Sequence, residues 1–521
     1  MALSVQVRTR GTWTAASAFP PVAMTVEEFE HQAVWGPISA RIRVQADLAT
    51  LWMLVDWLGS GLNIYARRAR PCWWGIYHTL ELDTGFMRHV FSLEQVRNKV
   101  AVQYSLAAPG LTTSSSATTT WASNAGSQAD FGIREFLASK EAMSASAAEQ
   151  LRDTLLSDLA YPVDDPRQGG GGGTPSAMLY GKGYHDHLGR RYCSLAAVGE
   201  SHIVDDLATS EHQKVGDVTA RTGMAQSFTM ATDDDFYAAT IRLPLSIYGA
   251  PGDTLQASIR ADSGGAPGAT IEAVTFSPAA MTTHTVWLEA ALACTNLLEY
   301  GTTYHLSLER TGAIDASNYY IVGASEALGY SRGSLLIWNG GAWVARSPDA
   351  DMPFVIGGVQ DSTRQIEKMV SGYGQYFAGT RIGAVSGVKS SPYRIGTGRA
   401  SDEIIDLLTN GTTNDRRLLA HVTRQKYLAI AEAPAFSAGT CKLLLNEKGR
   451  LVNRRTKEDI PPEECPAGKW CLLGDYPQGL INSPAIGKGR IFIERATWNV
   501  AEERWMVERG DPFKALDVRE G

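Results

Sequence analysis

The sequence carries one short run of metal-ligating side chains, His185-Asp186-His187, and a further histidine, His202, follows it. Alternate residues of a β-strand point to the same face, so the two histidines of the run could bind zinc together. The surrounding sequence, Tyr184-His-Asp-His-Leu-Gly-Arg, fits the polar tip of a hairpin equally well. The hairpin tip is the favoured interpretation, and no metal or cofactor is predicted.

Acidic side chains offer two further kinds of chemistry. Asp233-Asp234-Asp235 and Asp262 lie in predicted turns, where carboxylates could hold a structural calcium ion, although solvated turn acids are favoured. Glycoside hydrolysis needs two carboxylates roughly 5–10 Å apart, and the sequence singles out no such pair. The nucleophile elbow, the metalloprotease helix, the phosphate-binding loop and the dinucleotide fingerprint are missing from the sequence. The chain is therefore predicted not to be an enzyme.

Two tryptophans are the candidate glycan-binding residues. Trp338 and Trp343 flank Asn339-Gly-Gly, a sequence that favours a tight hairpin turn. An indole ring can stack on a sugar because it combines an apolar body with a polar edge. In the alternative, which is favoured, both rings pack the hairpin onto the rest of its domain.

Composition places the chain among globular proteins. At 521 residues it should contain three or four domains, each large enough to bury a core. Charged residues make up 20% and hydrophobic residues 44%, which is typical of soluble folded chains. The 51 glycines favour short strands and turns over long helices. The net charge of −7 argues against a dedicated nucleic-acid-binding protein, and the basic cluster Arg67-Arg68-Ala69-Arg70 fits a solvated turn.

The N-terminal sequence, the apolar stretches and the cysteine spacing indicate where the chain is made and whether its thiols are oxidised. The N-terminal residues lack the charged start and apolar run of a secretory signal, and no stretch approaches 18 apolar residues. The six cysteines are mostly far apart, and the spacing Cys465-x5-Cys471 suits neither zinc nor a redox pair. We expect reduced thiols in a chain made in the cytosol.

Residues 205–358 show the alternation of an antiparallel β-sandwich. Short strands recur at even spacing and are separated by turns such as Asp262-Ser-Gly-Gly-Ala-Pro-Gly268. The strands are expected at 226–230, 240–248, 255–260, 285–288, 303–308 and 319–322.

Two other segments, 38–82 and 393–434, share one layout of strand, helix, strand, turn and strand. The expected helix caps and helix-ending glycines are Asp47 and Gly59 in the first segment, and Ser401 and Gly411 in the second. The layout predicts a duplicated small domain. Because the two sequences barely match, a coincidence of two unrelated units is the alternative.

The section between these segments is predicted to be helical. Ser146-x-x-Glu149 forms a capping box. The apolar stripe that follows consists of Ala148, Leu151, Leu155 and Leu159. Five consecutive glycines, 169–173, then indicate a flexible linker or an exposed loop.

A strand in the first third of the chain is followed by a short motif. The strand is Asn98-Lys-Val-Ala-Val-Gln-Tyr104, and Ser127-x-x-x-Phe131-Gly132-x-Arg134-Glu135 follows after a Ser/Thr-rich loop. This arrangement resembles a segment of bacteriophage tail and baseplate hub proteins. The order of these pieces carries the resemblance, because each piece alone is short. An ordinary strand, loop and helix start in an unrelated protein is the alternative. The resemblance implies structural roles for Asn98, Tyr104, Ser127, Phe131, Gly132, Arg134 and Glu135.

A second resemblance concerns the sandwich. The pieces Ile259-Arg-Ala-Asp-Ser-Gly-Gly-Ala-Pro-Gly268, Gly301-Thr-Thr-Tyr-His-Leu306 and Trp338-Asn-Gly-Gly-Ala-Trp343 are similar to a jelly-roll module. That module is widespread in bacterial surface and phage proteins and is often carbohydrate-binding-like. The resemblance implies an inserted domain that binds glycan on a host surface, with purely architectural packing as the rival.

Together these observations predict a mainly β chain with α+β elements, in which two tube-like β-barrel domains form an internal repeat and an antiparallel jelly-roll sandwich is inserted. The expected domains are a first tube-like hub domain at 1–122, a helical connector and Gly-rich linker at 123–177, a second tube-like domain at 178–204 plus 359–434, the inserted sandwich at 205–358, and a C-terminal β-subdomain at 435–521.

The hub resemblance implies a structural virion protein that closes the distal end of a tail tube and organises the tail tip. Such a protein is made in the host cytoplasm and forms a homotrimeric ring in the virion. Its partners would be the tail tube, the distal tail or baseplate proteins and a central fibre or tip protein, with DNA only in transit through the lumen. A glycan-binding adhesin is the alternative of a different class. A polysaccharide-degrading tail enzyme is the third, disfavoured by the missing catalytic motifs.

Overall fold

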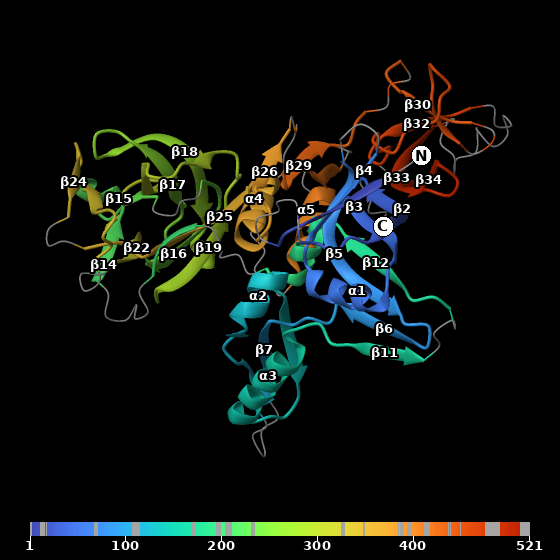
Figure 1. Ribbon diagram of the computed structural model, residues 1–521. Helices are drawn as coiled ribbons and strands as arrows, with labels where there is room; N and C mark the ends of the chain where they lie inside the picture. The colour runs from blue at the N-terminus through green and yellow to red at the C-terminus, as the bar shows by residue number, and fades with distance from the viewer. Residues whose placement is uncertain are drawn as a thin grey trace. The chain divides into compact units, whose positions relative to one another are not determined.

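The computed structural model describes residues 3–10, 16, 18–66, 71–106, 115–168, 173–193, 199–203, 211–230, 235–324, 329–346, 350–383, 385, 390–392, 398–410, 417–435, 437, 439–446, 448, 450–474 and 490–510. The chain is mainly β with smaller α+β elements, as predicted. It divides into two compact units, and the sandwich strands of the inserted unit are drawn in green to yellow in Figure 1, which is coloured by residue number. The first unit comprises Met1–Cys193, Ile366–Lys389 and Thr397–Gly521, and the inserted unit comprises Ser194–Gln365 and Ser390–Gly396.

The first unit is built on a curled sheet in which 13 described strands pair. Its main path runs through β1 (Ser4–Arg8), β4 (Gly61–Tyr65), β5 (Pro71–Asp83), β12 (Ser176–Lys182), β3 (Gly36–Gln45), β2 (Ala23–Gln32), β33 (Arg490–Asn499), β32 (Trp470–Leu473), β30 (Leu443–Leu445) and β31 (Leu451–Asn453). Beside this path lie β6 (Met87–Ser92), β11 (Asp165–Gln168) and β34 (Arg504–Gly510). Ala40, Ile42 and Val44 of β3 are buried and the residues between them are exposed, because strand side chains alternate between faces.

Two segments join this sheet contrary to the predicted domain boundaries. The sequence places residues 178–204 in the second tube-like domain, but β12 pairs with β3 on one side and with β5 on the other. The tail 435–521, predicted as a separate subdomain, likewise extends the first sheet, because β33 pairs with β2. Alternation along a chain marks a strand but does not name its partner, so long-range pairing decided both assignments.

The connection from β3 to β4 consists of α1 (Leu48–Met53) and the 3-10 turn η1 (Leu54–Trp57). The predicted cap is confirmed, since the Asp47 carboxylate accepts a hydrogen bond from the Thr50 amide at 2.9 Å. Gly59 follows the helical segment with a φ of +85°, and its amide donates to the Tyr77 carbonyl at 2.8 Å. Glycine adopts that φ without the Cβ penalty, so the predicted helix-ending glycine is confirmed.

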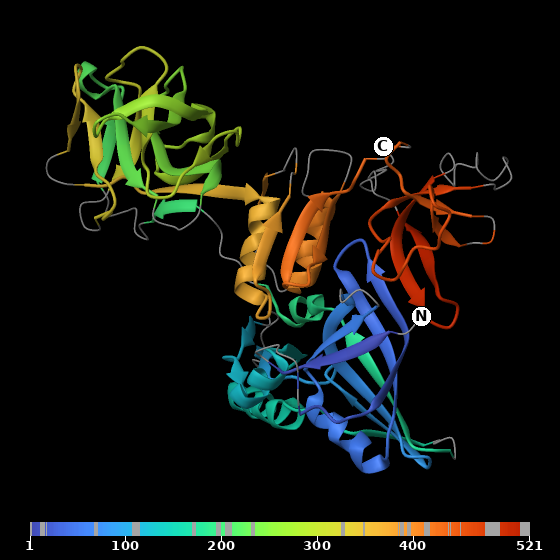
Figure 2. The ribbon, with the colours of Figure 1, turned by 45° about the horizontal axis from the view of Figure 1, so that its top comes forward.

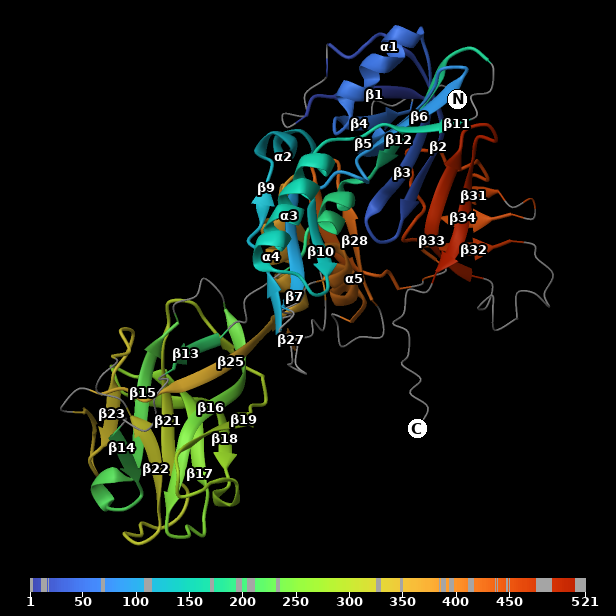
Figure 3. The ribbon, with the colours of Figure 1, turned by 90° about the horizontal axis from the view of Figure 1, so that it is seen from below.

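A smaller sheet carries the motif that resembles tail hubs. It contains β7 (Lys99–Leu106), β8 (Ser115–Thr118), β9 (Ala122–Ser123) and β10 (Glu135–Lys140), with β10 parallel to β7. The helices α2 (Ala125–Phe131) and α3 (Ala145–Leu159) belong to the same section, and Figure 3 shows α3 alongside β7. The buried Ala148 and the partly buried Leu151 and Leu155 of α3 pack with Val102 and Tyr104. The cap of α3 is Ser144, which accepts from the Ala147 amide at 3.2 Å, and the prediction of a capping box at Ser146 is wrong.

A three-stranded sheet contains strands of the segment predicted to be the second copy of the repeat. Its section contains α4 (Ser362–Tyr373), which starts at the end of the inserted unit, β26 (Gly379–Ile382), α5 (Ala400–Asn410), β28 (Leu418–Val422) and β29 (Tyr427–Glu432). β28 and β29 form an antiparallel hairpin after α5, and β26 lies parallel to β29. In the large sheet, β4 and β5 form the hairpin after α1, and β3 runs parallel to β5 with β12 between them. Both copies thus share a helix, a hairpin and a parallel strand, and the first copy has one additional strand.

Two details of the second copy differ from the prediction. Ser401 lies inside α5 rather than at its cap. The strand before α5 is β27 (Ser390–Pro392), which pairs with a strand of the inserted unit. Tyr393 and Gly411, like Arg67–Arg70 and most of the glycine run, lie outside the described residues.

The turn between β2 and β3 joins the two curled sheets of the first unit (Figure 2). The Trp35 amide donates to the Ala420 carbonyl, and the Val422 amide donates to the Trp35 carbonyl at 3.2 Å. The Trp74 indole adds a hydrogen bond to the Val422 carbonyl at 3.0 Å. These backbone bonds connect β28 to the first sheet, so the two sheets belong to one compact body.

The inserted unit is an antiparallel sandwich, as predicted. One sheet contains β13 (Gly199–His202), β25 (Phe354–Asp361), β16 (Phe236–Tyr248), β22 (Tyr319–Ala324), β14 (Glu211–Val215), β19 (Val286–Ala291), β20 (Leu297–Leu298) and β27. The other runs through β18 (Pro267–Phe276), β17 (Leu255–Asp262), β21 (Thr303–Arg310), β15 (Gly223–Thr229), β23 (Leu335–Trp338) and β24 (Trp343–Ala345). Two 3-10 turns, η3 (Thr219–Arg221) and η4 (Pro278–Ala280), connect strands. The inward side chains form a separate core that includes Phe228, Phe236, Tyr320 and Phe354.

Residues 199–357, which make up most of the inserted unit, should be removable. Gly199 and Gly357 are register partners in the β13–β25 pair, so their Cα atoms lie about 5 Å apart and a short Gly/Ser linker can join them. We expect a chain lacking residues 199–357 to fold, because the core of the first unit draws on none of the deleted side chains. Hydrogen exchange should show unchanged protection of β3, β5 and β12. Loss of that protection would show that the sandwich supports the first unit.

Candidate functional site

The motif residues lie together around the buried side chain of Asn98. Its amide nitrogen donates to the Gly132 carbonyl at 2.7 Å and to the Ser127 hydroxyl at 3.2 Å, and its amide oxygen accepts from the Arg134 amide at 2.7 Å. The Ser127 hydroxyl donates in turn to the Ala160 carbonyl. Asn98, which precedes β7, therefore holds the end of α2 and the start of β10 in place. Sequence positions about 30 residues apart form one hydrogen-bonded unit.

Local sequence explains how α2 reaches this position. Asn124 caps the helix by accepting from the Ser127 amide at 3.0 Å. Gly132 ends it with a φ of +75°, a conformation that favours glycine. A Cβ on Gly132 would lie 2.8 Å from the Tyr376 ring and 3.2 Å from the His187 ring, so this close approach also requires glycine.

The backbone of Arg134 belongs to this hydrogen-bonded group, and its guanidinium is a fully buried cation. Its guanidinium donates to the Leu93 carbonyl at 2.9 Å, to the Phe131 carbonyl at 3.3 Å and to the Asp186 carboxylate at 3.3 Å. Burial lowers the pKa of Arg134, while Asp186 opposes that effect. Burial acts to raise the pKa of Asp186, but Arg134 and the neighbouring basic groups hold it well below its usual value. The two residues therefore form a buried ion pair.

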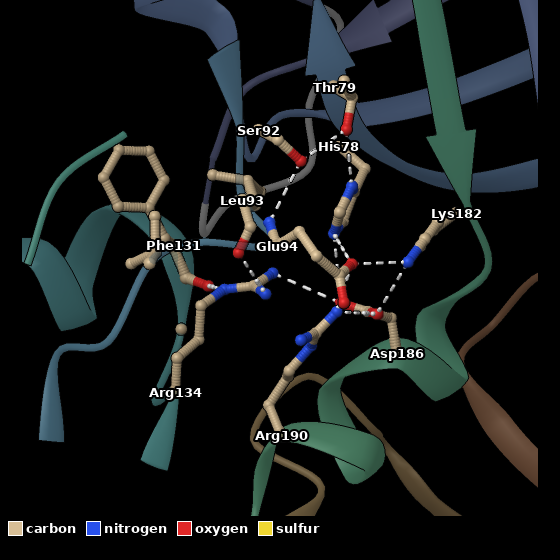
Figure 4. Close-up of polar contacts among 12 residues, drawn as sticks. His78, Thr79, Ser92, Leu93, Glu94, Phe131, Arg134, Lys182, Asp186 and Arg190 are labelled. Carbon is tan, nitrogen blue, oxygen red and sulfur yellow. Dashed lines mark hydrogen bonds and ion pairs between the residues drawn. The ribbon is translucent and has the colours of Figure 1, made fainter. Parts of the chain in front are cut away.

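Further charges surround this pair, and Figure 4 shows them converging from β5, β12, the 3-10 turn η2 (Tyr184–Arg190) and the segment after β6. We define the Arg134 cluster as His78, Glu94, Arg134, Lys182, Asp186 and Arg190. Glu94 binds Lys182 at 2.8 Å and Arg190 at 2.6 Å, and Arg190 also contacts Asp186 at 3.1 Å. Burial raises the pKa of Glu94, but its hydrogen bonds to Arg190 and Lys182 bring it down to about 2.

His78, Glu94 and Asp186 are the one group in the described chain whose ligand atoms approach closely enough for a shared metal ion. His78 Nε2 lies 3.7 Å from both carboxylates. However, both carboxylates already contact cationic side chains, and the cluster holds two negative and three positive groups with His78 neutral. A divalent ion would lie beside those cations and would have to displace them. The donor set therefore fits an ion-pair network better than a metal site.

The predicted histidine run has a different structure from either interpretation of its sequence. Residues 185–187 lie in η2, where successive side chains diverge, and not on a strand or an exposed hairpin tip. His185 stacks on Trp35 with ring centroids 5.7 Å apart, and His187 lies 4.3 Å from the Tyr376 ring. His202 belongs to the inserted unit and lies 5.4 Å from the Tyr330 ring. The structure thus separates the proposed zinc ligands and instead uses Asp186 as the partner of Arg134.

Glu135 connects the motif to the residues that follow η2. Its carboxylate binds Lys99 at 2.9 Å and Arg191 at 3.2 Å, and accepts from the Tyr192 amide at 2.7 Å. Its backbone carbonyl accepts from Arg399, whose guanidinium also lies 3.9 Å from the Tyr192 ring. Glu135 therefore fixes β10 against the chain leading to α5.

The side chains of the two remaining motif residues, Phe131 and Tyr104, contribute by packing. Phe131 lies under the Arg10 guanidinium, with 5.1 Å to the ring centroid, and contacts Tyr161 edge-on at 6.2 Å. Tyr104 is buried in the small core beneath α3. Glu94 is the important member that the sequence did not indicate, and the sequence indicates Asp186 only as part of a metal-ligating run and not as the partner of Arg134. A buried arginine requires a carboxylate partner, but no spacing in the chain indicates which one.

Trp338 and Trp343 form the edge of a small pocket in the inserted unit. They are cross-strand partners on β23 and β24, with ring centroids 5.6 Å apart and an interplanar angle of 62°. The predicted hairpin between them is confirmed. The pocket has a volume of about 200 Å³. Its lining residues are Thr222, Gly223, Arg260, Glu309, Trp338 and Trp343.

The turn acids of the sandwich have protein partners. Asp262 accepts from His305 at 2.8 Å and from the Gly265 amide at 3.1 Å. Asp235 accepts from the Tyr300 amide at 2.8 Å. Asp233 and Asp234 lie outside the described residues. Within the described part, these acids do not gather into a group of three close ligands.

The six cysteines, all among the described residues, are free thiols. Among the described helices, none combines the length and the apolar composition that crossing a bilayer requires.

Comparisons with known proteins do not name a family. No protein-family profile matches the chain, and no curated protein matches it. One matched solved structure is the functional form of the mosquito-larvicidal Cry4Aa toxin from Bacillus thuringiensis, at 9% identity and a TM-score of 0.15. The match covers 59% of this chain and 52% of the toxin chain, so it spans about half of that structure's length. A TM-score this low carries no argument about fold or function.

Replacing Arg134 with methionine should strongly destabilise the first unit. Removing one partner of a buried ion pair leaves the other charge buried without compensation, which costs about 3–5 kcal/mol. We expect urea denaturation to show a loss of that size. Arg450→Ala is the control, because Arg450 and its partner Asp459 are both 44% exposed and such pairs contribute about 1 kcal/mol or less. Equal small losses for both variants would contradict a central role for Arg134.

The free energy of unfolding should decrease as the pH is lowered, first because of buried histidines and then because of the carboxylates of the Arg134 cluster. Burial lowers the pKa of His31 and His185 to about 4 and of His78 and His187 to about 3. Their ordinary pKa is about 6.5, so the unfolded chain binds more protons and folding stability is lost as pH falls from about 6.5 towards 4 for His31 and His185, and towards 3 for His78 and His187.

The carboxylates of the Arg134 cluster act at lower pH. The pKa values of these carboxylates in the folded chain lie below the ordinary values, so their contribution to folding stability is present above about pH 4 and is lost below it. Differential scanning fluorimetry from pH 7 to 3 should show Tm decreasing already between pH 6.5 and 4.5. A constant Tm over that interval would show that these histidines are not buried as neutral groups.

Proposed function

We propose that this chain is a structural protein of a bacteriophage-type tail, where it forms the hub at the distal end of the tail tube. The observation that carries the proposal is the hub-like motif. Asn98, Ser127, Gly132 and Arg134, which carry the sequence resemblance, are also the residues joined around the Asn98 amide. A chance similarity of short pieces would not require those particular residues to meet at the Asn98 side chain, which bonds the Ser127 hydroxyl and the backbone of Gly132 and Arg134.

The arrangement of the first unit supports a ring assembly. It contains two curled sheets, each with a helix followed by an antiparallel hairpin and a strand parallel to the second hairpin strand. Three copies of such a chain supply six similar sectors, which match a hexameric tube through a closed cyclic symmetry. The proposed partners are the tail tube, the distal tail or baseplate proteins and a central fibre or tip protein, with DNA passing through the lumen.

The inserted unit supports a second role within the same particle. It has its own core. Its first strand, β13, pairs with β25 near the end of the main inserted segment, as expected for a module added to a loop. We propose that it attaches the tip to glycan on the host surface, since the Trp338 pocket offers aromatic and polar groups together. An adhesin working as a single soluble chain is the rival proposal.

The assembly state separates the two. We expect the purified chain, measured by mass photometry and analytical ultracentrifugation, to form trimers, and cryo-electron microscopy of the source particle to place three copies at the distal end of the tube. Obligate contacts of this kind bury about 2,000 Å² or more. A monomer both in solution and in the particle would exclude the hub and leave the adhesin.

A further inference from the structure

The Trp338 pocket lies on the outward face of the six-stranded sheet. Ile259, Leu306 and Leu308 point into the sandwich core, so by strand alternation Arg260 and Glu309 point outward. Arg260 Nη2 contacts Glu309 Oε1 at 2.8 Å, with the two side chains 21% and 36% exposed. The pocket therefore has an ion pair from β17 and β21 beside the two indoles of β23 and β24.

The aromatic edge of the pocket is held by its own turn. Asn339 accepts from the Ala342 amide at 2.9 Å and from the Gly341 amide at 3.1 Å, and Gly340 has a φ of +94°. The Asn339 amide also donates to the Ala342 carbonyl at 3.1 Å. These bonds fix the hairpin before any ligand arrives, which lowers the entropic cost of binding.

The hollow itself depends on the missing side chain of Gly223. A Cβ there would lie 3.0 Å from Glu309 Cγ and 3.3 Å from the Trp343 ring. Glycine at this position on β15 thus leaves room between the carboxylate and the indole. The ring plane of Trp343 is tilted by 62° from that of Trp338, so the pair presents one face and one edge and not two parallel walls.

The chemistry of the lining restricts what can bind. Arg260 offers N–H donors and Glu309 offers carboxylate acceptors, and together with Thr222 they can pair with groups that both donate and accept. The two charges compensate each other, so an anionic or cationic ligand would gain little. The volume of about 200 Å³ is below the roughly 300–1,000 Å³ of pockets for drug-sized molecules, and it suits a single small ring.

We propose that this pocket binds one uncharged sugar residue with neighbouring hydroxyl groups. One C–H face of the ring would lie against an indole, while adjacent hydroxyls accept from Arg260 and donate to Glu309. This inference deepens the proposed glycan-binding role of the inserted unit and rests on it, but it does not depend on the hub assembly. Three pockets on one trimer would raise weak single-site binding through effective concentration.

The test uses the full-length chain with defined probes. The neutral probes are the methyl glycosides of glucose, galactose, mannose, rhamnose and N-acetylglucosamine, and the charged probes are glucuronic acid and N-acetylneuraminic acid. Isothermal titration and saturation-transfer NMR should detect saturable, millimolar binding of at least one neutral glycoside and weaker or no binding of the charged sugars. Glu309→Gln and Trp343→Ala should each weaken that binding about tenfold or more, because each removes a charge-assisted hydrogen bond or a stacking surface.

Trp287→Ala is the matched control, since Trp287 lies on β19 of the other sheet with the Arg242 guanidinium 5.2 Å from its ring. This variant should leave sugar affinity unchanged, and a thermal melt of each variant confirms that it folds. Absence of saturable binding by every neutral glycoside, or preference for the charged sugars, would overturn the proposal.

A glycan array with the same chains distinguishes two kinds of failure. Binding to the array that survives both Glu309→Gln and Trp343→Ala would place the glycan site elsewhere and overturn the assignment to this pocket. No binding to the array by the unmodified chain would overturn the glycan-binding role as a whole. Neither result bears on the trimer, which is measured separately.

Discussion

The burial of the Arg134 guanidinium is the constraint on which the arrangement of the first unit depends. A charge removed from water must be paired and hydrogen-bonded, since an isolated buried ion is too costly for a fold to retain. Arg134 meets this demand with two backbone carbonyls, from Leu93 and Phe131, and with the carboxylate of Asp186. Phe131 is a local partner at the end of α2, whereas Leu93 after β6 and Asp186 in η2 are remote in sequence, so satisfying one cation fixes two distant parts of the chain against the end of α2.

The turn η2 has a central place because it supplies that carboxylate. Its other side chains then fill the space around it, with His185 against Trp35 and His187 against Tyr376. Trp35 also bonds through its backbone to β28, so the packing of η2 extends to the second curled sheet. The histidines are neutral because burial lowers their pKa values. Their role is therefore packing between elements, and we expect the same burial to make the first unit sensitive to acid.

The inserted unit is held together by an apolar core. Its core closes between two antiparallel sheets, and its main segment, Ser194–Gln365, has β13 as its first strand and β25 as its last, paired with each other. Because this core is independent, outward residues such as Arg260, Glu309 and Trp343 are free to serve recognition without weakening the fold. Within the proposed function, the two units divide the tasks: buried polar groups specify an assembly scaffold, and an exposed pocket with balanced charge selects a ligand.

Local patterns in the sequence determined much of this protein. Alternation predicted the strands of the sandwich, Asp47 and Gly59 marked the ends of the first helical segment, and the turn Asn339-Gly-Gly predicted the β23–β24 hairpin. These features depend on neighbours within a few residues, where propensity and capping act directly. Alternation could not show that β12 pairs with β3 and β5, or that β33 extends the first sheet through β2. Only the tertiary structure decided that Asp186 pairs with Arg134, 52 positions away, instead of joining two histidines at a metal. A buried charge requires compensation, but the folded chain alone determines which distant group comes close enough to provide it.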